Sequence, residues 1–479
     1  MPTAHRPTTD LPVWAKAITR TATEFPRTPL PLLCGKIPEG LRGTLYRNGP
    51  GRLERGGMRM GHWFDGDGAI LAVDFTNEGA TGTYRYVRTQ KYREEEAAGK
   101  LLYGNYGMVA PGSLWQRWSK SVGNVANTSV LALDDRLLAL WEGGKPHALD
   151  LQTLETRGLD DLSALGKNGC YSAHPKRDGQ TGEIFNFGVT VGRPAILNLY
   201  KSDRTGKIMQ TSATPLDRMP MLHDFVLAGQ YLIFFLPPIQ MKLFPVLLGL
   251  SSFSDAMVWQ PEWGTQILVF DRQTLELVSR GEAQPWFQWH FANGYQEESG
   301  IVAIDFVRYD DWTTNRRLKE IGAGKTNTIA EGMLTRVRLD AKTGKGVGSE
   351  PLSDRPGEFP SVPPSQVGRE ASQIYLSCHR RHADIARELY GAIACIDCHM
   401  GTWQEFDFGE NRYPTEPIYA PDAFDAERGW VTTVVYDGNT DTSEVWVFAG
   451  DRLDDEPVCR LGLPQVVPMG FHGTWKPHN

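Results

Sequence analysis

The chain has 479 residues, of which 41% are hydrophobic and 22% charged, and its formal net charge is −7. A chain of this length can bury a large core, and length alone suggests two or three domains unless the fold is a large closed all-β architecture. The acidic balance and the lack of a basic stripe argue against a nucleic-acid partner. Six cysteines without disulfide-framework spacing fit a reducing cytoplasm.

The N-terminal segment, residues 1–38, lacks the apolar stretch of a secretory signal peptide. It is rich in Thr and Arg and poor in acidic residues before Glu24, as transit peptides are, but its prolines would interrupt an amphipathic presequence helix. We therefore expect residues 1–38 to form an extended arm lying over the folded body, and residues 39–479 to form a single domain of a cytoplasmic protein.

Strand signals dominate the rest of the chain. Short runs rich in apolar, β-branched and aromatic residues, bounded by Gly, Pro or Asp, predict strands. The clearest runs are residues 137–141, 231–235, 266–270, 301–306 and 431–436. Helical patterns are few, and the best candidates are residues 114–121 and 381–390.

A short turn pattern recurs along the chain. Asp150, Asp178, Asp271 and Asp340 each follow a strand-like run and precede a Thr by three residues. Carboxylate and hydroxyl oxygens at these positions accept hydrogen bonds from turn N–H groups, so the pattern predicts repeated hairpins. Hairpins repeated through a long all-β chain indicate a β-propeller, which protects its sheet edges by radial repetition. The spacing does not choose among six, seven or eight blades.

Two segments have the composition of membrane contacts. Residues 231–253 are the most apolar in the chain, but prolines and polar residues interrupt them, so they do not predict a transmembrane helix. They fit either a buried strand followed by a core-packed loop, or an exposed loop that dips into one leaflet with Lys242 reaching back to the interface. Residues 111–120 place Trp115 and Trp118 beside basic residues, as interfacial segments do.

Four of the 11 histidines lie in separate blocks, each among apolar or aromatic residues: His174, His223, His290 and His472. A single histidine of this kind is usually a hydrogen-bonded core residue. Four such blocks suggest one metal ion held entirely by imidazole, with each ligand delivered by a different part of a closed fold. Imidazole suits Zn, Cu, Fe and Ni, so the pattern alone leaves the metal open.

The residues flanking these histidines belong to a longer series of motifs. In chain order they are residues 43–51 (GTLYRNGPG), 62–68 (HWFDGDG), 126–128 (ANT), 140–144 (LWEGG), 173–176 (AHPK), 223–225 (HDF), 358–360 (EFP), 416–417 (EP) and 472–473 (HG). The series covers nearly the whole chain and resembles the carotenoid cleavage oxygenases, especially the bacterial, cyanobacterial-type apocarotenoid oxygenases.

This resemblance implies a fold and an activity. The fold would be an all-β, seven-bladed β-propeller with a dome of loops and short helices over one face. One non-haem Fe(II) per chain would be held by His174, His223, His290 and His472. The enzyme would be a dioxygenase that uses O2 to cleave a conjugated double bond of a lipophilic polyene, a carotenoid or apocarotenoid, into two carbonyl (aldehyde) products.

The resemblance also implies roles around the metal. Glu142, Glu358 and Glu416 stand where the family has carboxylates that accept ring N–H groups of the ligands, and such partners orient imidazoles and balance charge. His174 corresponds to the ligand without a glutamate. Thr128 corresponds to a position whose side chain can obstruct one coordination site.

Substrate and membrane contacts follow from the same resemblance. Trp141 occupies the position at which stilbene-cleaving relatives carry a Lys that engages a phenol, so a carotenoid-type substrate is favoured, and Phe64 is a candidate lining residue of the substrate tunnel. In the family, loops equivalent to residues 231–253 and 111–120 form an apolar patch around the tunnel mouth. We therefore expect peripheral attachment to a membrane surface.

Other interpretations of the motifs compete with this one. Cys395 to His399 fits the attachment pattern of c-type haem, Cys378, His382, Cys395 and Cys398 could form a zinc site, and Asp65 to Gly68 is similar to the start of a calcium loop. Alternative functions on the same scaffold are stilbene cleavage, retinoid isomerohydrolysis and a non-catalytic propeller that serves as a binding platform.

Overall fold

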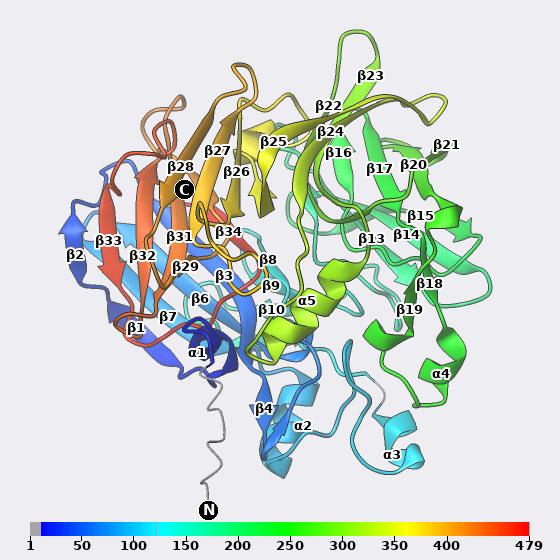
Figure 1. Cartoon of the computed structure of the whole chain (residues 1–479), viewed down its shortest axis with the longest axis horizontal. Helices are drawn as coiled ribbons and strands as arrows, with labels where there is room; N and C mark the ends of the chain where they lie inside the picture. Colours follow the sequence, from blue (N-terminus) through cyan, green and yellow to red (C-terminus); the bar gives the residue numbers. More distant parts are fainter. Residues whose placement is uncertain (1–10, 121, 479) are drawn as a thin grey trace, which may run out of the picture.

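The computed structural model describes residues 11–120 and 122–478, and its fold is mainly β (Figure 1). Residues 1–10 of the expected arm lie outside the described residues. Antiparallel sheets fill the upper part of the view in Figure 1, and the helices α2 (Gln90–Ala98), α3 (Leu114–Ser119) and α4 (Leu243–Leu247) lie at the bottom. The fold thus places strands in the body and short helices on one side.

The sheets are best described by the order of their hydrogen-bonded strands. The first runs β1 (Phe25–Pro29), β7 (Gly79–Tyr86), β6 (Asp67–Thr76), β3 (Gly43–Arg52) and β34 (Gly473–Pro477). The second runs β11 (Thr156–Leu159), β10 (His147–Leu149), β9 (Leu137–Leu140) and β8 (Ser129–Ala132), and the third runs β12 (Lys176–Arg177), β13 (Ile184–Thr190), β14 (Ala195–Ser202) and β15 (Ile208–Leu216).

The remaining large sheets are longer. One continuous path contains β21 (Leu277–Ala283), β20 (Thr265–Asp271), β17 (Tyr231–Leu236), β16 (Val226–Ala228), β22 (Phe287–Gln296), β23 (Ile301–Tyr309), β24 (Met333–Asp340), β25 (Lys345–Ser361), β26 (Gln373–Cys378), β27 (Ala392–Asp397) and β28 (Trp403–Asp407). The last contains β2 (Leu32–Gly35), β33 (Cys459–Gly462), β32 (Thr442–Ala449), β31 (Gly429–Asp437) and β29 (Arg412–Pro414), with β30 (Ile418–Pro421) also pairing with β31.

Short elements complete the fold. Two small ribbons pair β4 (Glu54–Arg55) with β5 (Met58–Arg59) and β18 (Ile239–Met241) with β19 (Met257–Trp259). The other helices are α1 (Ala15–Thr19), α5 (Thr313–Gly322) and the 3-10 turns η1 (Trp63–Asp65), η2 (Ser254–Ala256), η3 (Pro261–Trp263) and η4 (Pro364–Gln366).

The two ends of the chain meet within the sheets. β34 pairs with β3, so the last strand completes the sheet that contains the earliest long strand. β2 pairs with β33 and β1 pairs with β7, which attaches residues 25–35 to the first and last sheets. Ahead of them, Trp14 and Ile18 of the α1 region are buried. The described part of residues 1–38 therefore contributes two edge strands and core side chains.

The turn pattern is confirmed at all four positions. Asp150 Oδ1 accepts hydrogen bonds from the backbone N–H groups two and three residues on, at 2.9 and 2.8 Å, in the β10–β11 hairpin. Asp178 and Asp271 repeat this arrangement in the β12–β13 and β20–β21 hairpins. At the β24–β25 turn, Asp340 accepts from the Lys342 N–H and from the Thr343 hydroxyl.

The helix expected over residues 381–390 is wrong. This segment forms turns, and the carbonyls of Ala386 and Glu388 accept hydrogen bonds from the guanidinium of Arg317 instead of from a following helical turn. The helix expected at 114–121 is confirmed as α3, with residue 121 outside the described residues. The strand runs at 137–141, 231–235, 266–270, 301–306 and 431–436 are confirmed as β9, β17, β20, β23 and β31.

A buried ion pair joins three of the segments that carry the four histidines. Asp224, which follows His223, lies 2.8 Å from Nζ of Lys176, just beyond the first of the four histidines. Its other oxygen accepts a hydrogen bond of 2.9 Å from the backbone N–H of Phe291, which follows His290. Asp224 is 2% exposed, so these contacts are made away from water and hold the three segments in register.

Asn48 ties in the fourth histidine segment. Its backbone N–H donates to the carbonyl of His472 at 2.8 Å, and its side-chain amide donates to the carbonyl of Ser129 at 2.8 Å. The Ser129 hydroxyl in turn donates to the carbonyl of Ala173, the residue before the first histidine. A buried series of hydrogen bonds therefore connects all four segments.

Asp224→Ala should destabilise the protein by about 3 kcal/mol. This is the low end of the range for breaking a buried ion pair, chosen because the Lys176 side chain keeps 18% exposure. The midpoint of urea unfolding measures the effect. Asp310→Ala, at a side chain that is 97% exposed, is the control and should leave the midpoint unchanged. Equal midpoints for the two variants would show that the Asp224 contacts do not stabilise the fold.

Candidate functional site

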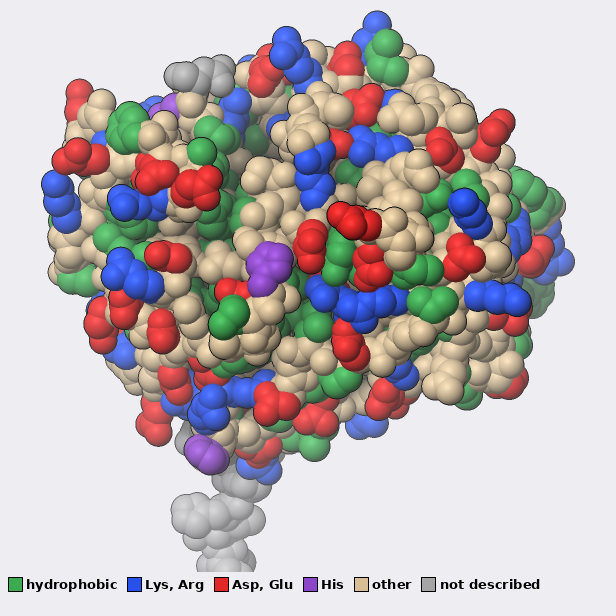
Figure 2. Space-filling model, turned by 90° about the horizontal axis from the view of Figure 1, so that it is seen from above, with side chains coloured by type: hydrophobic (Ala, Val, Ile, Leu, Met, Phe, Trp, Pro, Cys, Tyr) green, Lys and Arg blue, Asp and Glu red, His purple; other side chains and the backbone are tan. Residues whose placement is uncertain are grey.

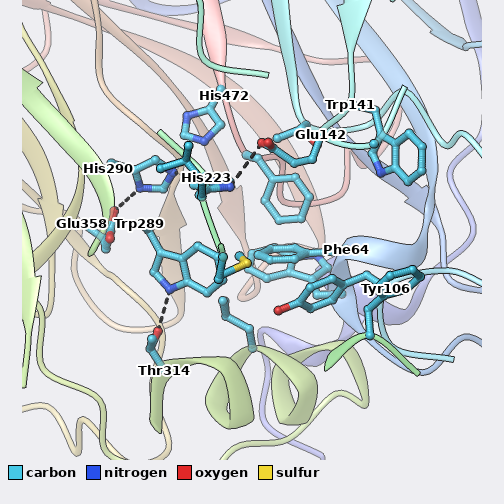
Figure 3. A pocket seen from close by; sticks show the side chains of 18 of the residues that line it. Phe64, Tyr106, Trp141, Glu142, His223, Trp289, His290, Thr314, Glu358 and His472 are labelled. Carbon is cyan, nitrogen blue, oxygen red and sulfur yellow. Dashed lines mark hydrogen bonds and ion pairs between the residues drawn. The ribbon is translucent and has the colours of Figure 1, made fainter. Parts of the chain in front are cut away.

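His223, His290 and His472 line one wall of a cavity of about 420 Å³ (Figure 3), and His174 packs against their rings. Most of the lining is apolar or aromatic, including Phe64, Trp141, Met221, Met257, Trp289 and Phe471. In Figure 3, the histidines lie at the top and α5, which carries Thr314, runs across the bottom. The arrangement suits a long apolar ligand that passes close to the imidazoles.

The imidazole nitrogens converge tightly. Ligand atoms of His174, His223, His290 and His472 all lie within 4.8 Å of one another. Nε2 of His174 is 3.0 Å from Nε2 of His223, which is 3.3 Å from Nε2 of His290. Each of the four residues is 8% exposed, so the rings are almost fully enclosed. The structure thus brings together all four histidines that the sequence singled out.

The three glutamates lie behind the rings, each at a different histidine. His290 Nδ1 is 2.5 Å from Glu358 Oε2, and His472 Nδ1 is 2.8 Å from Glu416 Oε1. His223 Nδ1 lies 3.2 Å from Glu142 Oε1, a contact too poorly aligned to count as a hydrogen bond. His174 has no such partner among the described residues, and its Nε2 is 3.8 Å from Glu142.

The glutamates are supported unequally. Glu416 also lies 3.4 Å from Nη1 of Arg47 and accepts the backbone N–H of Gly473 at 2.8 Å. Glu358 accepts the hydroxyl of Tyr309 at 3.2 Å. The Glu142 side chain is 32% exposed, and its Oε1 has no hydrogen-bond partner. The side of the site nearest Glu142 is therefore the least constrained.

Burial keeps two of the rings neutral. Loss of solvent, followed by repulsion from the neighbouring histidines, lowers the pKa of His174 and of His472 well below 6.5. Burial raises the pKa of Glu416 to about 7, against the opposing charge of Arg47. Neutral imidazole is the form that binds a metal ion.

These residues fit a metal ion. Where Nδ1–H points at a glutamate, as for His290 and His472, Nε2 carries a lone pair and cannot donate. Lone pairs that face one another within the 4.8 Å that encloses the four ligand atoms repel, and a cation among them removes the repulsion. The Nε2 spacing is compatible with the metal–nitrogen distance of about 2.0–2.1 Å seen for imidazole ligands of zinc. The donor set is one that Fe, Cu, Zn and Ni accept.

Thr128, Trp141 and Phe64 all line the cavity. The backbone carbonyl of Thr128 accepts the N–H of His472 at 3.3 Å, which places its side chain beside the histidines. A Cβ at Gly143 would approach the Trp141 ring to 2.8 Å, so glycine permits this ring position. Phe64 packs edge-on against Trp289 and Phe471, with ring centroids 5.5 and 5.3 Å away.

Several lining residues were not singled out in the sequence. The Trp289 indole lines the cavity and donates to the Thr314 hydroxyl at 3.0 Å. Its position directly before His290 in the sequence was a signal that could have identified it. Tyr106 offered no local signal. Its hydroxyl donates to Asn315 at 2.8 Å, a contact with a residue more than 200 positions away.

The competing metal motifs do not assemble. Among residues 11–120 and 122–478, the group with metal-binding geometry is the four histidines, and it contains no cysteine. Cys395 lies within β27, and Cys398 lies in the turn after it. Both carboxylate oxygens of Asp65 accept backbone N–H groups, from His62 at 3.0 Å and Gly107 at 2.9 Å, so Asp65 stabilises the η1 turn.

Comparison with known proteins gives consistent matches over the whole fold. The family model described as retinal pigment epithelial membrane protein matches residues 18–477. The apocarotenoid-15,15'-oxygenase of Synechocystis sp. is 31% identical over 458 residues, covering 92% of this chain and 91% of that one. Resveratrol cleavage oxygenase 1 of Aspergillus fumigatus is 26% identical over 478 residues, covering 92% and 91%.

A solved structure of a Synechocystis apocarotenoid oxygenase mutant superposes with a TM-score of 0.89 at 28% identity, covering 97% of this chain and 98% of the other. The family match, the shared fold and the four-histidine centre agree with the motif series found in the sequence. The chain therefore belongs to the retinal pigment epithelial membrane protein family, which includes the carotenoid cleavage oxygenases.

Proposed function

We propose that this protein is a non-haem Fe(II) dioxygenase that cleaves a conjugated double bond of a carotenoid or apocarotenoid with O2, giving two aldehydes. The observation that carries the proposal is the convergence of four imidazoles, three of which line the wall of an apolar cavity. The 31% identity to an apocarotenoid-15,15'-oxygenase supports it. One Fe(II) per chain would be held by His174, His223, His290 and His472, and would supply the redox chemistry toward O2.

The chain's own residues would act mainly by position. Glu142, Glu358 and Glu416 would hold the rings and balance the charge of the metal. Thr128 would restrict the space beside the histidines, so that ligands approach from one direction. The apolar lining would exclude water and align the polyene, with Phe64 and Trp141 against its length. No side chain is needed as a general acid or base.

Trp141 supports a polyene over a stilbene. An indole ring has no ammonium group to engage a phenol, but its flat apolar face suits a conjugated chain. The similarity to a resveratrol cleavage oxygenase keeps stilbene cleavage as the alternative to be tested alongside.

We propose that the body is a seven-bladed propeller formed by residues 39–479, and that residues 1–38 are an arm that adds two edge strands, β1 and β2, to its sheets. The five-, four-, four- and six-stranded sheets account for four blades. The eleven-stranded path is divided at two weak points. β16 and β22 are joined in parallel only at Ala228 and Gly294, and β25 pairs with β24 up to Pro356 but with β26 from Gly357 onward. These divisions give three further blades.

We propose that α3 and α4 attach the protein to the surface of a membrane. Trp115 is 75% exposed on α3, and Phe244 and Leu247 are 73% and 69% exposed on α4. α3 contacts the turn after α4, since Arg117 Nη1 donates to the Gly249 carbonyl at 3.1 Å, and the two helices project from the same side in Figure 1. None of the described helices is long and apolar enough to cross a bilayer, so the contact would be with one leaflet.

Burial changes along residues 231–253, for which the sequence left two alternatives. β17 is fully buried, as the core interpretation requires, whereas α4 and Leu250 are exposed, as the membrane interpretation requires. On the face shown in Figure 2, acidic and basic side chains are interspersed, without an apolar patch of the kind that α3 and α4 form.

Replacing any one of the four ligand histidines with Ala should abolish cleavage and lower the iron content, which is expected to be one per chain in the wild type. Metal analysis and product identification with a panel of carotenoids, apocarotenals and stilbenes measure both. His147→Ala is the matched control, because His147 is 5% exposed and lies on β10 outside the cavity. Full activity in a ligand variant would contradict the assignment, and iron-free wild type without activity on any substrate would favour a binding platform.

Glu358→Gln and Glu416→Gln should each reduce activity or iron affinity by about 10–100-fold, the usual effect of removing a carboxylate behind a histidine ligand. Glu142→Gln should lie at the mild end, because Glu142 makes the longest of the three contacts. Glu350→Gln, at a side chain that is 50% exposed, serves as the control. Wild-type kinetics and iron content in all three variants would reduce these glutamates to ordinary structural carboxylates.

Leu247→Glu combined with Leu250→Glu should release the protein from liposomes. Burying one Leu contributes roughly 1.5–3 kcal/mol, so two lost contacts are enough to decide peripheral attachment. Both side chains are exposed, at 69% and 63%, so folding should be unaffected. Turnover of membrane-delivered substrate should fall, while turnover of detergent-solubilised substrate persists.

Leu159→Glu with Met209→Glu is the matched control for this test. These side chains are similarly exposed, at 65% and 63%, but lie on β11 and β15. Normal liposome binding by the folded Leu247 and Leu250 variant, or equal loss in the control, would refute the role of α4.

A further inference from the structure

The cavity has an exposed mouth and a buried inner end. At the mouth, the lining residues Val122 and Val191 are 38% and 56% exposed. Where the lining comes from α5 and from the segment that follows β26 it is buried: Arg317, His379 and Leu389 are only 7%, 4% and 7% exposed, and we call this part the inner compartment. A ligand that enters at the mouth and extends to this part of the cavity brings one end to the inner compartment.

The inner compartment contains a positive charge without an acidic partner. Nη1 of Arg317 donates to the carbonyl of Thr328 at 2.6 Å, and Nη2 donates to that of Glu388 at 2.7 Å. Over the part of the chain that the structure describes, no carboxylate lies within ion-pair distance of Arg317, and its Nε–H has no acceptor. Carbonyl dipoles offset part of the cost of burying this cation, but its charge is not neutralised.

The neighbouring polar groups add donor capacity. Tyr390 is partly exposed, and it lines the cavity. The Tyr390 hydroxyl lies next to the Tyr309 hydroxyl. The Tyr309 hydroxyl itself donates a hydrogen bond to Glu358. His379 packs against Tyr390 with ring centroids 4.7 Å apart, and burial lowers the pKa of His379 to about 3, so it adds no second charge. The Glu358 carboxylate is occupied by His290.

An apolar tunnel does not require a buried guanidinium and a tyrosine hydroxyl at its closed end. Arg317 also holds the 384–390 segment by its carbonyls, which explains why Arg317 is present but not why its Nε–H is free or why Tyr390 faces the cavity. The Arg317 Nε–H has no protein acceptor among the described residues, and such a donor is complementary to an oxygen that only accepts hydrogen bonds, while the Tyr390 hydroxyl can turn to the same oxygen.

We propose that the compartment formed by Arg317, Tyr390 and His379 binds the oxygenated end of the polyene, a carboxylate or a carbonyl group, and so fixes which double bond lies beneath the histidines. The inference rests on the proposed polyene substrate, and it adds an end-group preference to it. A carboxylate binds tightest because it meets the charge of Arg317, a carbonyl follows, and a hydroxyl, which must also place its own proton, binds more weakly.

Anaerobic binding separates this preference from catalysis. Retinoic acid, retinal and retinol share one polyene and differ only in the end group, and quenching of tryptophan fluorescence in the iron-loaded protein without O2 reports their binding, since Trp289 and Trp141 line the cavity. The acid should bind on the order of 10-fold more tightly than the alcohol, as expected for a hydrogen bond to a charged group.

Two substitutions locate the preference. Tyr390→Phe removes only a hydroxyl and should weaken the acid and the aldehyde by about 3–10-fold, while Arg317→Gln should remove most of the advantage of the acid over the aldehyde. Tyr200→Phe, outside the cavity, is the control. If Arg317→Gln fails to fold, the wild-type order and Tyr390→Phe still decide the question.

The outcomes are distinct. Equal binding of the three retinoids to the wild type, or an order that survives both substitutions, overturns the proposal. The expected binding order together with no cleavage of any carotenoid under O2 leaves the end-group site standing and refutes the proposed oxygenase. With an active enzyme, Tyr390→Phe should also broaden the set of bonds that are cleaved, seen as additional aldehyde products.

Discussion

Four imidazole rings are held in a buried site with their ligand nitrogens within 4.8 Å of one another, where facing lone pairs repel, and much of the structure around them acts to keep them there. Each ring comes from a different segment, so no single stretch of sequence can position all four. The buried contacts of Asp224 and Asn48, which are not ligands, hold the four segments together. Glu358 and Glu416 hydrogen-bond to the rings of His290 and His472, and burial keeps His174 and His472 neutral.

The cavity, unlike the histidine centre, is lined mainly by apolar side chains. These large apolar and aromatic side chains exclude water but make no directional contacts that would orient a ligand. Few polar groups face the cavity, and the buried Arg317 is one of the residues that carry them. Under the proposals above, the histidine centre holds the metal that supplies the chemistry, while the polar groups determine how a long polyene is placed beneath it.

The sequence predicted what is encoded locally. The Asp-x-x-Thr turns and the short apolar strands depend on neighbouring residues, and they are present as expected. The four histidines and three glutamates were grouped through their flanking motifs, and the structure places them within contact of one another. The number of blades was beyond local patterns, because it depends on how sheets divide.

What the sequence missed depends on contacts between distant segments. Residues 381–390 have a helical composition, but two of their carbonyls accept hydrogen bonds from Arg317. No local sequence pattern in either segment predicts that contact. Residues 231–253 look uniformly apolar, yet their first half is a buried strand and their second half is exposed, because β17 pairs with β20 while α4 has no sheet to join. Tyr106 and Tyr390 reach the cavity only through tertiary folding.

The way in which the chain ends are joined also sets the order of assembly during synthesis. The pairing of β2 with β33 and that of β3 with β34 can form only after the C-terminal strands have been synthesised. His472 lies directly before β34, the final strand. A ribosome that has released the first three of the four histidines has not yet made β34, so the sheet that contains β3 and the four-histidine group are both incomplete. The four rings can come together only after residues 472–477 have joined β3, so the group is absent from chains that are truncated before His472.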